Sequence, residues 1–168
     1  MENRTLLDAS HRAAIFVDTN ILVYHLLDDE LYGAPCKNFL NRVEEKELKA
    51  FISPIVIAES LFIYLRFWII KHKKIVPKKV LEYLKQHREV INKVNFQKPQ
   101  SLFTIFENLP IDSGIIESSY HIMKLHNLLP NDAINIALIK HHNISAIATH
   151  DNDFNDIEGI EVLKPIRL

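Results

Sequence analysis

The stretch Ala13-Ala14-Ile15-Phe16-Val17-Asp18-Thr19-Asn20-Ile21-Leu22 decides the fold of this chain. A mostly apolar run ends at Asp18, a polar pair follows, and a second apolar run begins at Ile21. This pattern predicts a buried strand that ends in a carboxylate and passes directly into a helix. Open α/β sheets bind ligands at the carboxyl ends of such strands, so we expect Asp18 to lie at a functional edge.

Length and composition indicate one ordinary domain. The chain has 168 residues, of which 48% are hydrophobic, and this is enough apolar material for a substantial core. The single cysteine, Cys36, excludes an intrachain disulfide and a Cys-based structural zinc site, and it favours a reducing, cytoplasmic setting. A formal net charge of −1 argues against a uniformly basic nucleic-acid-binding domain, so any basic surface must be local.

The expected domain organisation follows from the distribution of polar and apolar segments. Residues 1–12 are polar and of mixed charge, and we expect them to form a loose N-terminal leader. Residues 13–168 form the single predicted domain, in which 61–108 is a helical insertion or interface region. The longest apolar run, 61–70, is broken by Arg66 and is too short for a membrane crossing, which predicts a soluble protein.

Short predicted strands alternate with longer predicted helices, a pattern typical of a parallel sheet in a layered α/β domain. Strands are expected at the opening stretch and at 48–52, 144–149 and 160–163. Helices are expected after Asp18, from about 34, from Ser53, from 77 to about 95, at 101–108, after Asp112 and from Pro130. The predicted fold class is a single three-layer α/β/α domain with a central, mostly parallel sheet.

Two acids in this pattern are unusual for different reasons. Asp18 alone is more typical of a helix cap than of a catalyst. Glu59 has apolar neighbours three and four residues away on both sides, so its carboxylate is expected to project from an apolar helix surface. An ionised carboxylate without a partner there would be costly, and we expect Glu59 to pair with a metal ion or with a base such as Arg66.

Two more acids lie at the ends of other predicted elements. Asp132 begins a helix, whose dipole favours a negative charge, and capping is the simpler explanation. Asp151, with Asp153 close behind, follows a predicted strand, although such a turn is ordinarily a solvated loop. If the strands that end at Asp18 and Thr149 are parallel neighbours, these anions share one crevice. A divalent cation would relieve their repulsion, and oxygen ligands suit Mg²⁺ or Mn²⁺.

Four segments then carry a resemblance to a known family. They are Val17-Asp18-Thr19-Asn20-Ile21-Leu22, Ser53-Pro54-Ile55-Val56-Ile57-Ala58-Glu59, Leu129-Pro130-Asn131-Asp132-Ala133-Ile134-Asn135-Ile136-Ala137 and Ala148-Thr149-His150-Asp151-Asn152-Asp153-Phe154. Their order and spacing resemble the PIN-domain ribonucleases, most closely the VapC-type toxin branch. The resemblance spans about residues 13 to 165.

The resemblance implies a set of site residues and an activity. The catalytic and metal-binding acids would be Asp18, Glu59, Asp132 and Asp151, with Asp153 assisting, while Thr19, Asn20, Ser53 and Thr149 would orient carboxylates and water. The implied activity is that of a Mg²⁺- or Mn²⁺-dependent endoribonuclease that leaves 5′-phosphate and 3′-hydroxyl ends. The implied role is the toxin of a type II toxin–antitoxin pair, with RNA as substrate, an antitoxin protein as partner, and a homodimer as assembly.

Other interpretations remain open at this point. The chain could be a non-catalytic PIN-like dimeric module for RNA binding or interaction, with 61–70 as its surface, or a housekeeping RNA-processing nuclease. A haloacid-dehalogenase-like phosphatase needs a second aspartate where this chain has Asn20, and the histidines lack the spacing of a zinc site. Five lysines either contact the RNA backbone or form a solvated connection: Lys71, Lys73, Lys74, Lys78 and Lys79.

Overall fold

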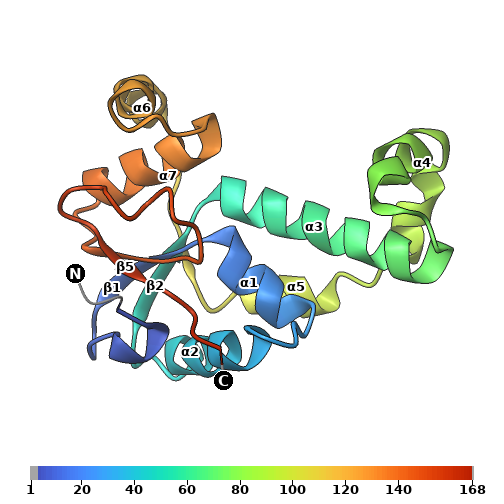
Figure 1. Cartoon of the computed structure of the whole chain (residues 1–168), viewed down its shortest axis with the longest axis horizontal. Coiled ribbons are helices and arrows are strands. Elements are labelled where there is room, and N and C mark those ends of the chain that lie inside the picture. The colour runs from blue at the N-terminus through green and yellow to red at the C-terminus, as the bar shows by residue number, and fades with distance from the viewer. Residues whose placement is uncertain (1–3, 168) are drawn as a thin grey trace.

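A computed structural model describes residues 4–167 of the chain, and Figure 1 shows their arrangement. The centre is a parallel sheet of five strands in the order β3-β2-β1-β4-β5. The strands are β1 (Ala14–Val17), β2 (Lys49–Ile52), β3 (Glu107–Asn108), β4 (Ala146–Ala148) and β5 (Glu161–Leu163). The predicted class, a layered α/β fold around a parallel sheet, is confirmed, although the short edge strand β3 was not predicted.

Helices cover the sheet, with α2 and the α6–α7 pair on opposite sides (Figure 1). The α-helices are α1 (Thr19–Leu26), α2 (Gly33–Glu44), α3 (Pro54–Lys73), α4 (Val80–Gln86), α5 (Gln97–Phe103), α6 (Ser113–His126) and α7 (Pro130–His141). Short 3-10 helices are η1 (Leu6–Asp8), η2 (Pro77–Lys79) and η3 (Arg88–Lys93). Within residues 4–167, every helix lacks the length or the hydrophobicity needed to span a membrane.

Local signals explain where the main helices begin. The Ser53 hydroxyl accepts a hydrogen bond from the backbone of Val56 at 3.2 Å, and Pro54 supplies the fixed backbone of the first helical position of α3. Asp112 caps α6 in the same way. The middle strand β1 is covered on both faces, because Ile15, Phe16 and Val17 are fully buried. These features hold the carboxyl end of β1 in a rigid frame.

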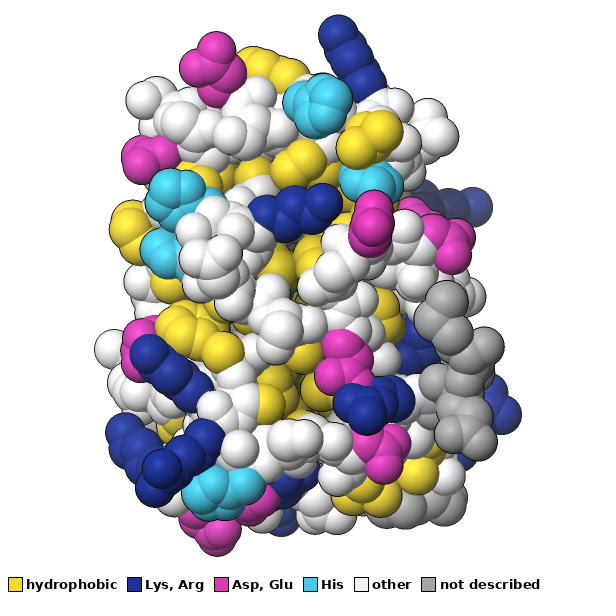
Figure 2. All heavy atoms as spheres, turned by 90° about the vertical axis from the view of Figure 1, so that its left-hand side faces the viewer, with side chains coloured by type: hydrophobic (Ala, Val, Ile, Leu, Met, Phe, Trp, Pro, Cys, Tyr) yellow, Lys and Arg dark blue, Asp and Glu magenta, His cyan; other side chains and the backbone are white. Residues whose placement is uncertain are grey.

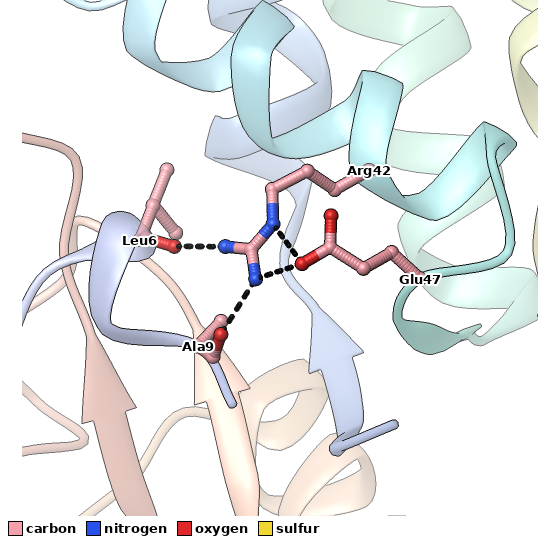
Figure 3. Close-up of polar contacts among 4 residues, drawn as sticks. All are labelled: Leu6, Ala9, Arg42 and Glu47. Atoms are coloured by element: carbon pink, nitrogen blue, oxygen red, sulfur yellow. Dashed lines mark hydrogen bonds and ion pairs between the residues drawn. The ribbon is translucent and has the colours of Figure 1, made fainter. Parts of the chain in front are cut away.

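The N-terminal segment is packed rather than loose from residue 4 onward, which differs from the predicted leader; residues 1–3 lie outside the described part. Figure 3 shows the reason. The guanidinium of Arg42 in α2 donates to the backbone carbonyls of Leu6 at 3.4 Å and Ala9 at 2.7 Å, and it also pairs with Glu47 at 2.7 Å. Leu6 is thereby held in the core at 2% exposure.

We expect Arg42→Ala to release this segment. The variant leaves two carbonyls and the Glu47 carboxylate without their donor, which should lower the free energy of unfolding by about 1 kcal/mol because these groups are partly hydrated. For a chain of this size the melting temperature should fall by about 2 to 4 °C. Calorimetry and limited proteolysis near residue 10 measure the effect, with Arg88→Ala, an exposed arginine in η3, as the control. Equal melting and cleavage in both variants would contradict the role of Arg42.

The segment from 77 to 95 is not the single amphipathic helix that its pattern predicted. The chain breaks at His87, where φ is −133° and ψ is 55°, between α4 and η3. A continuous helix would place Ile91 on the same face as Leu84, but Val90 is buried at 2% exposure and Ile91 is 42% exposed. The break turns Val90 inward, onto a small apolar cluster with Ile69 at the end of α3. This cluster is separate from the main core.

Candidate active site

Asp18 lies where β1 ends and α1 begins. Its Oδ1 accepts a hydrogen bond from the backbone N–H of Thr19 at 2.7 Å, so it caps α1. Its Oδ2 accepts from the hydroxyl of Thr149 at 2.6 Å and from the side-chain amide of Asn20. The residue is only 8% exposed. Both carboxylate oxygens are therefore fixed in orientation, and Asp18 is a cap and a buried anion at once.

Thr149 links the two strand ends. Parallel pairing of β1 with β4 brings Thr149 beside Asp18. The Thr149 hydroxyl donates to Asp18 and accepts from the side chain of Asn20 and from the backbone N–H of Asp151, both at 3.0 Å. The amide oxygen of Asn20 in turn accepts from the backbone of His150 at 2.9 Å. The structure thus brings together Asn20, Thr149 and the loop that carries Asp151.

Glu59 reaches the same edge from α3. Its carboxylate accepts a hydrogen bond from the Thr19 hydroxyl at 2.8 Å and another from the side-chain amide of Asn131. Arg66, the base considered as its partner, makes no ion pair with it among residues 4–167 and instead lies over the ring of Phe62. Neutral donors therefore hold Glu59, and no arginine in the described part of the chain forms an ion pair with it.

The electrostatics of Asp132 show that the acids are close neighbours. Burial raises the pKa of Asp132 to about 6, and the negative charges of Asp18, Asp151, Glu59 and Asp153 contribute to this increase. Burial also raises the pKa of Asp18, with smaller contributions from Glu59 and Asp151 that oppose its hydrogen bonds. The acid that follows β1, the acids of α3 and α7, and the acids in the loop after β4 are thus close enough to repel one another.

The donor set fits a hard divalent cation. The converging side chains offer carboxylate oxygens, which suit Mg²⁺ or Mn²⁺, and a cation would relieve the repulsion that raises the pKa of Asp132. They do not form a closed cage, because no three Asp, Glu, His or Cys side chains among residues 4–167 are arranged to enclose a metal ion. Mg²⁺ commonly keeps several waters and uses only one or two carboxylates, so an open arrangement is compatible with it.

Ser53 does not contact the acids, although it was predicted to orient them. Its buried hydroxyl donates to the side-chain oxygen of Asn135 at 2.8 Å. Since Ser53 begins α3 and Asn135 lies in α7, this bond connects the two helices that carry Glu59 and Asp132. The hydrogen bond from Asn131 to Glu59 was not predicted, because the sequence pattern assigned no role to Asn131.

The five lysines lie away from the acids. Lys71 and Lys73 are in the last turn of α3, and Lys74, Lys78 and Lys79 follow it. Lys71 is twelve residues beyond Glu59 in the same helix, which corresponds to about 18 Å. None of the five forms an ion pair within residues 4–167.

Figure 2 shows the face of the molecule that is at the left in Figure 1, where acidic and basic side chains are interspersed.

The fold and the site together define a parallel α/β protein with an acidic site at the carboxyl edge of its sheet. The PIN domain pattern matches residues 15–160, and the chain belongs to the PIN-domain family. It is 35% identical over 150 residues to Ribonuclease VapC2 of Methanocaldococcus jannaschii, covering 89% of this chain and 93% of that protein. The predicted family is therefore confirmed.

Solved structures support the same fold. A toxin–antitoxin complex from Klebsiella pneumoniae matches with a TM-score of 0.56 at 21% identity, over 93% of this chain and 100% of the matched chain. VapC20 of Mycobacterium tuberculosis, described as a toxin that cleaves the sarcin-ricin loop, matches with a TM-score of 0.55 at 15% identity, over 89% of this chain and 98% of that one. At these identities the likeness establishes the architecture only.

Proposed function

We propose that this chain is a divalent-metal-dependent endoribonuclease of the VapC type, acting as the toxin of a type II toxin–antitoxin pair. The observation that carries the proposal is the convergence of four acids from separate segments, Asp18, Glu59, Asp132 and Asp151. Their mutual repulsion contributes to the raised pKa values of Asp18 and Asp132. A relative named a ribonuclease matches nearly the whole chain. PIN-domain ribonucleases generally depend on a divalent metal ion, and the oxygen donors here favour Mg²⁺ or Mn²⁺.

The residues have distinct roles in the proposed reaction. A bound Mg²⁺ or Mn²⁺ would supply an activated water and neutralise charge on the scissile phosphate. The four acids would hold the ion, and Asp153 would assist. Thr149 and Asn20 keep Asp18 in one orientation, while Thr19 and Asn131 do the same for Glu59. Ser53 acts more remotely, through the junction of α3 with α7.

Cleavage of mixed cellular RNA tests the proposal. The purified chain is incubated with Mg²⁺, with Mn²⁺ or with EDTA, beside Asp132→Asn and the control Asp156→Asn, an exposed acid outside the cluster. We expect 5′-phosphate products with either metal, none in EDTA, loss of cleavage in Asp132→Asn and normal cleavage in the control. RNA binding without cleavage by the wild-type chain would instead support the non-catalytic module.

Thr149→Val should reduce the rate of cleavage. Valine has nearly the same shape but cannot donate to Asp18 or accept from Asp151, so both acids lose a fixed orientation. Loss of such an orienting partner commonly costs about 10- to 100-fold in activity or metal affinity. Steady-state kinetics and Mn²⁺ titration measure the effect, and Thr149→Ser, which keeps the hydroxyl, should retain most of both. Wild-type kinetics in the valine variant would contradict this role.

We also propose an antitoxin partner and a homodimer. One neighbour in fold was solved as a toxin–antitoxin complex. An apolar groove of about 380 Å³ between α3 and α5 offers protein-binding surface, and its lining is Leu61, Phe62, Leu65, Phe96, Gln100 and Phe103. Affinity purification from the native host should recover a small second protein, and light scattering should give twice the mass of the chain. Recovery of the chain alone, as a monomer, would contradict both.

The lysines after Glu59 are proposed to contact the RNA backbone far from the cut. They are charged and carry no carboxylate partner within residues 4–167. Lys71 and Lys73 also lie over the rings of Phe67 and Trp68, at 5.9 and 6.0 Å, which limits their mobility. Such contacts would be sensitive to salt and independent of RNA sequence.

A further inference from the structure

A cluster of aromatic and cationic side chains lies beside the acidic site. Tyr24 comes from α1, Tyr32 from the loop before α2, and His150 from the loop after β4. The ring of Tyr32 lies 4.4 Å from that of His150 and 5.0 Å from that of Tyr24, between centroids. The hydroxyl of Tyr24 is 2.7 Å from Nδ1 of His150. Arg167, near the C-terminus, donates from Nε to the Tyr32 hydroxyl at 3.2 Å.

This cluster is joined directly to the proposed catalytic acids. His150 is flanked in sequence by Thr149 and Asp151, and its backbone N–H donates to Asn20, which itself binds Asp18. The ring of His150 therefore belongs to the residue directly before Asp151, one of the acids proposed to act on the scissile phosphodiester. A nucleotide next to the scissile phosphate would come within reach of them.

The loop that carries Tyr32 is held in place by its own contacts. The carboxylate of Asp29 accepts hydrogen bonds from the backbone of Leu31 at 3.0 Å and of Tyr32 at 2.9 Å. Gly33, which follows the loop as the first residue of α2, lies so close to α1 that an added Cβ would be 3.3 Å from the carbonyl oxygen of Tyr24. Tyr24 and Tyr32 remain half-buried and do not belong to the fully buried core. The rings are thus ordered before any ligand binds.

Two cations extend the cluster. Arg167 is exposed, and neither Arg167 nor Lys164 forms an ion pair with a carboxylate in the part of the chain that the structure describes. The Lys164 ammonium instead donates to the side chain of Asn152, in the loop that carries Asp151. Cations that make no direct ion pair within the described residues, beside an acidic site, suit a ligand that carries phosphate groups.

We propose that Tyr24, Tyr32, His150 and Arg167 form a subsite for one nucleotide of single-stranded RNA, adjacent to the scissile phosphate. The base stacks against the aromatic rings, and the phosphate pairs with the guanidinium of Arg167. Stacking on aromatic and arginine side chains is the common chemistry of single-strand recognition, and it tolerates every base. The proposal rests on the proposed ribonuclease function, because that function supplies the strand that crosses the acidic site.

Binding to a fluorescein-labelled, single-stranded RNA of mixed sequence tests the subsite in EDTA, where cleavage is not expected. A second probe of equal length carries abasic riboses. Tyr32→Phe, which keeps the ring but lacks the hydroxyl that Arg167 contacts, is the reference for Tyr32→Leu. Tyr32→Leu should bind the first probe about tenfold more weakly than Tyr32→Phe does, and the two variants should bind the abasic probe equally. Arg167→Gln should weaken both, since it removes a phosphate contact. Arg88→Gln, which changes a remote exposed arginine, is the control and should bind both probes like the wild type.

The outcomes separate this proposal from the ribonuclease function. Unchanged RNA binding by Tyr32→Leu and Arg167→Gln, together with normal metal-dependent cleavage by the wild type, would overturn the subsite and leave the ribonuclease intact. If the two variants bind RNA more weakly than the wild type, but the wild type does not cleave RNA with either metal, the subsite would be supported and the ribonuclease function contradicted. Arg167 is exposed, so Arg167→Gln decides the test even where Tyr32→Leu fails to fold. A lower melting temperature with unchanged RNA affinity would mean that the cluster only anchors the C-terminus.

Discussion

Asp18→Asn is expected to lose RNA cleavage by more than about a hundredfold while the chain stays folded, since even orienting partners of metal ligands cost up to that much. The substitution keeps the size of the side chain and the Oδ1 acceptor that caps α1. It removes the negative charge and replaces Oδ2 with an amide that faces the amide of Asn20. The site thus loses its most buried anion.

Melting in EDTA separates this loss from unfolding. Burial raises the pKa of Asp18, so its ionised form is costly in the folded chain without metal. The neutral asparagine should therefore melt at or above the temperature of the wild type. Kinetic measurement of cleavage, with Asp156→Asn as the matched control, completes the test. Cleavage by Asp18→Asn at the wild-type rate would remove Asp18 from the proposed site.

Saturating Mn²⁺ is expected to raise the melting temperature by about 5 to 10 °C near pH 7, because a ligand at a hundredfold excess over its Kd adds about 2.7 kcal/mol. The increase should be much smaller near pH 5. Burial and the neighbouring acids raise the pKa of Asp132 to about 6, so near pH 5 most of this group is protonated and must lose a proton to bind the ion. Calorimetry at the two pH values measures the difference.

The same pKa determines how the metal-free stability depends on pH. Between the ordinary value of 3.8 and about 6, the folded chain binds more protons at Asp132 than the unfolded chain does. The contribution of Asp132 to stability is therefore complete below pH 3.8 and is lost as the pH rises through 6. Above pH 6 the folded chain must hold Asp132 in its ionised form, which destabilises it, and Asp132→Asn removes this destabilisation.

Asp132 is half-buried and partly screened by solvent. In EDTA near pH 7, Asp132→Asn should therefore raise the free energy of unfolding by about 1 kcal/mol and the melting temperature by about 2 to 4 °C. Its response to Mn²⁺ should be weaker than that of the wild type. Asp156→Asn, outside the cluster, should behave like the wild type in both respects. A Mn²⁺ response that is the same at both pH values, or unchanged in Asp132→Asn, would contradict the place of Asp132 in the site.

Local sequence patterns predicted much of the fold. The caps at Asp18, Ser53 and Asp112 and the alternation of short strands with helices each depend on neighbours within a few residues. The break at His87 was not predictable in this way, because it depends on whether Val90 or Ile91 packs onto the end of α3. The packed N-terminal segment likewise depends on Arg42, more than thirty residues away.

The sequence by itself determined the class of fold and the family, and it predicted the four acids of the proposed site, since each is encoded in short ordered segments around Asp18, Glu59, Asp132 and Asp151. Only the tertiary structure decided which polar groups serve those acids. Ser53 donates to Asn135 and not to an acid, and Asn131 donates to Glu59. The rings of Tyr24, Tyr32 and His150 lie in one cluster. The physical reason is that side-chain partners across a parallel sheet edge are set by strand order and helix packing, which no local spacing encodes.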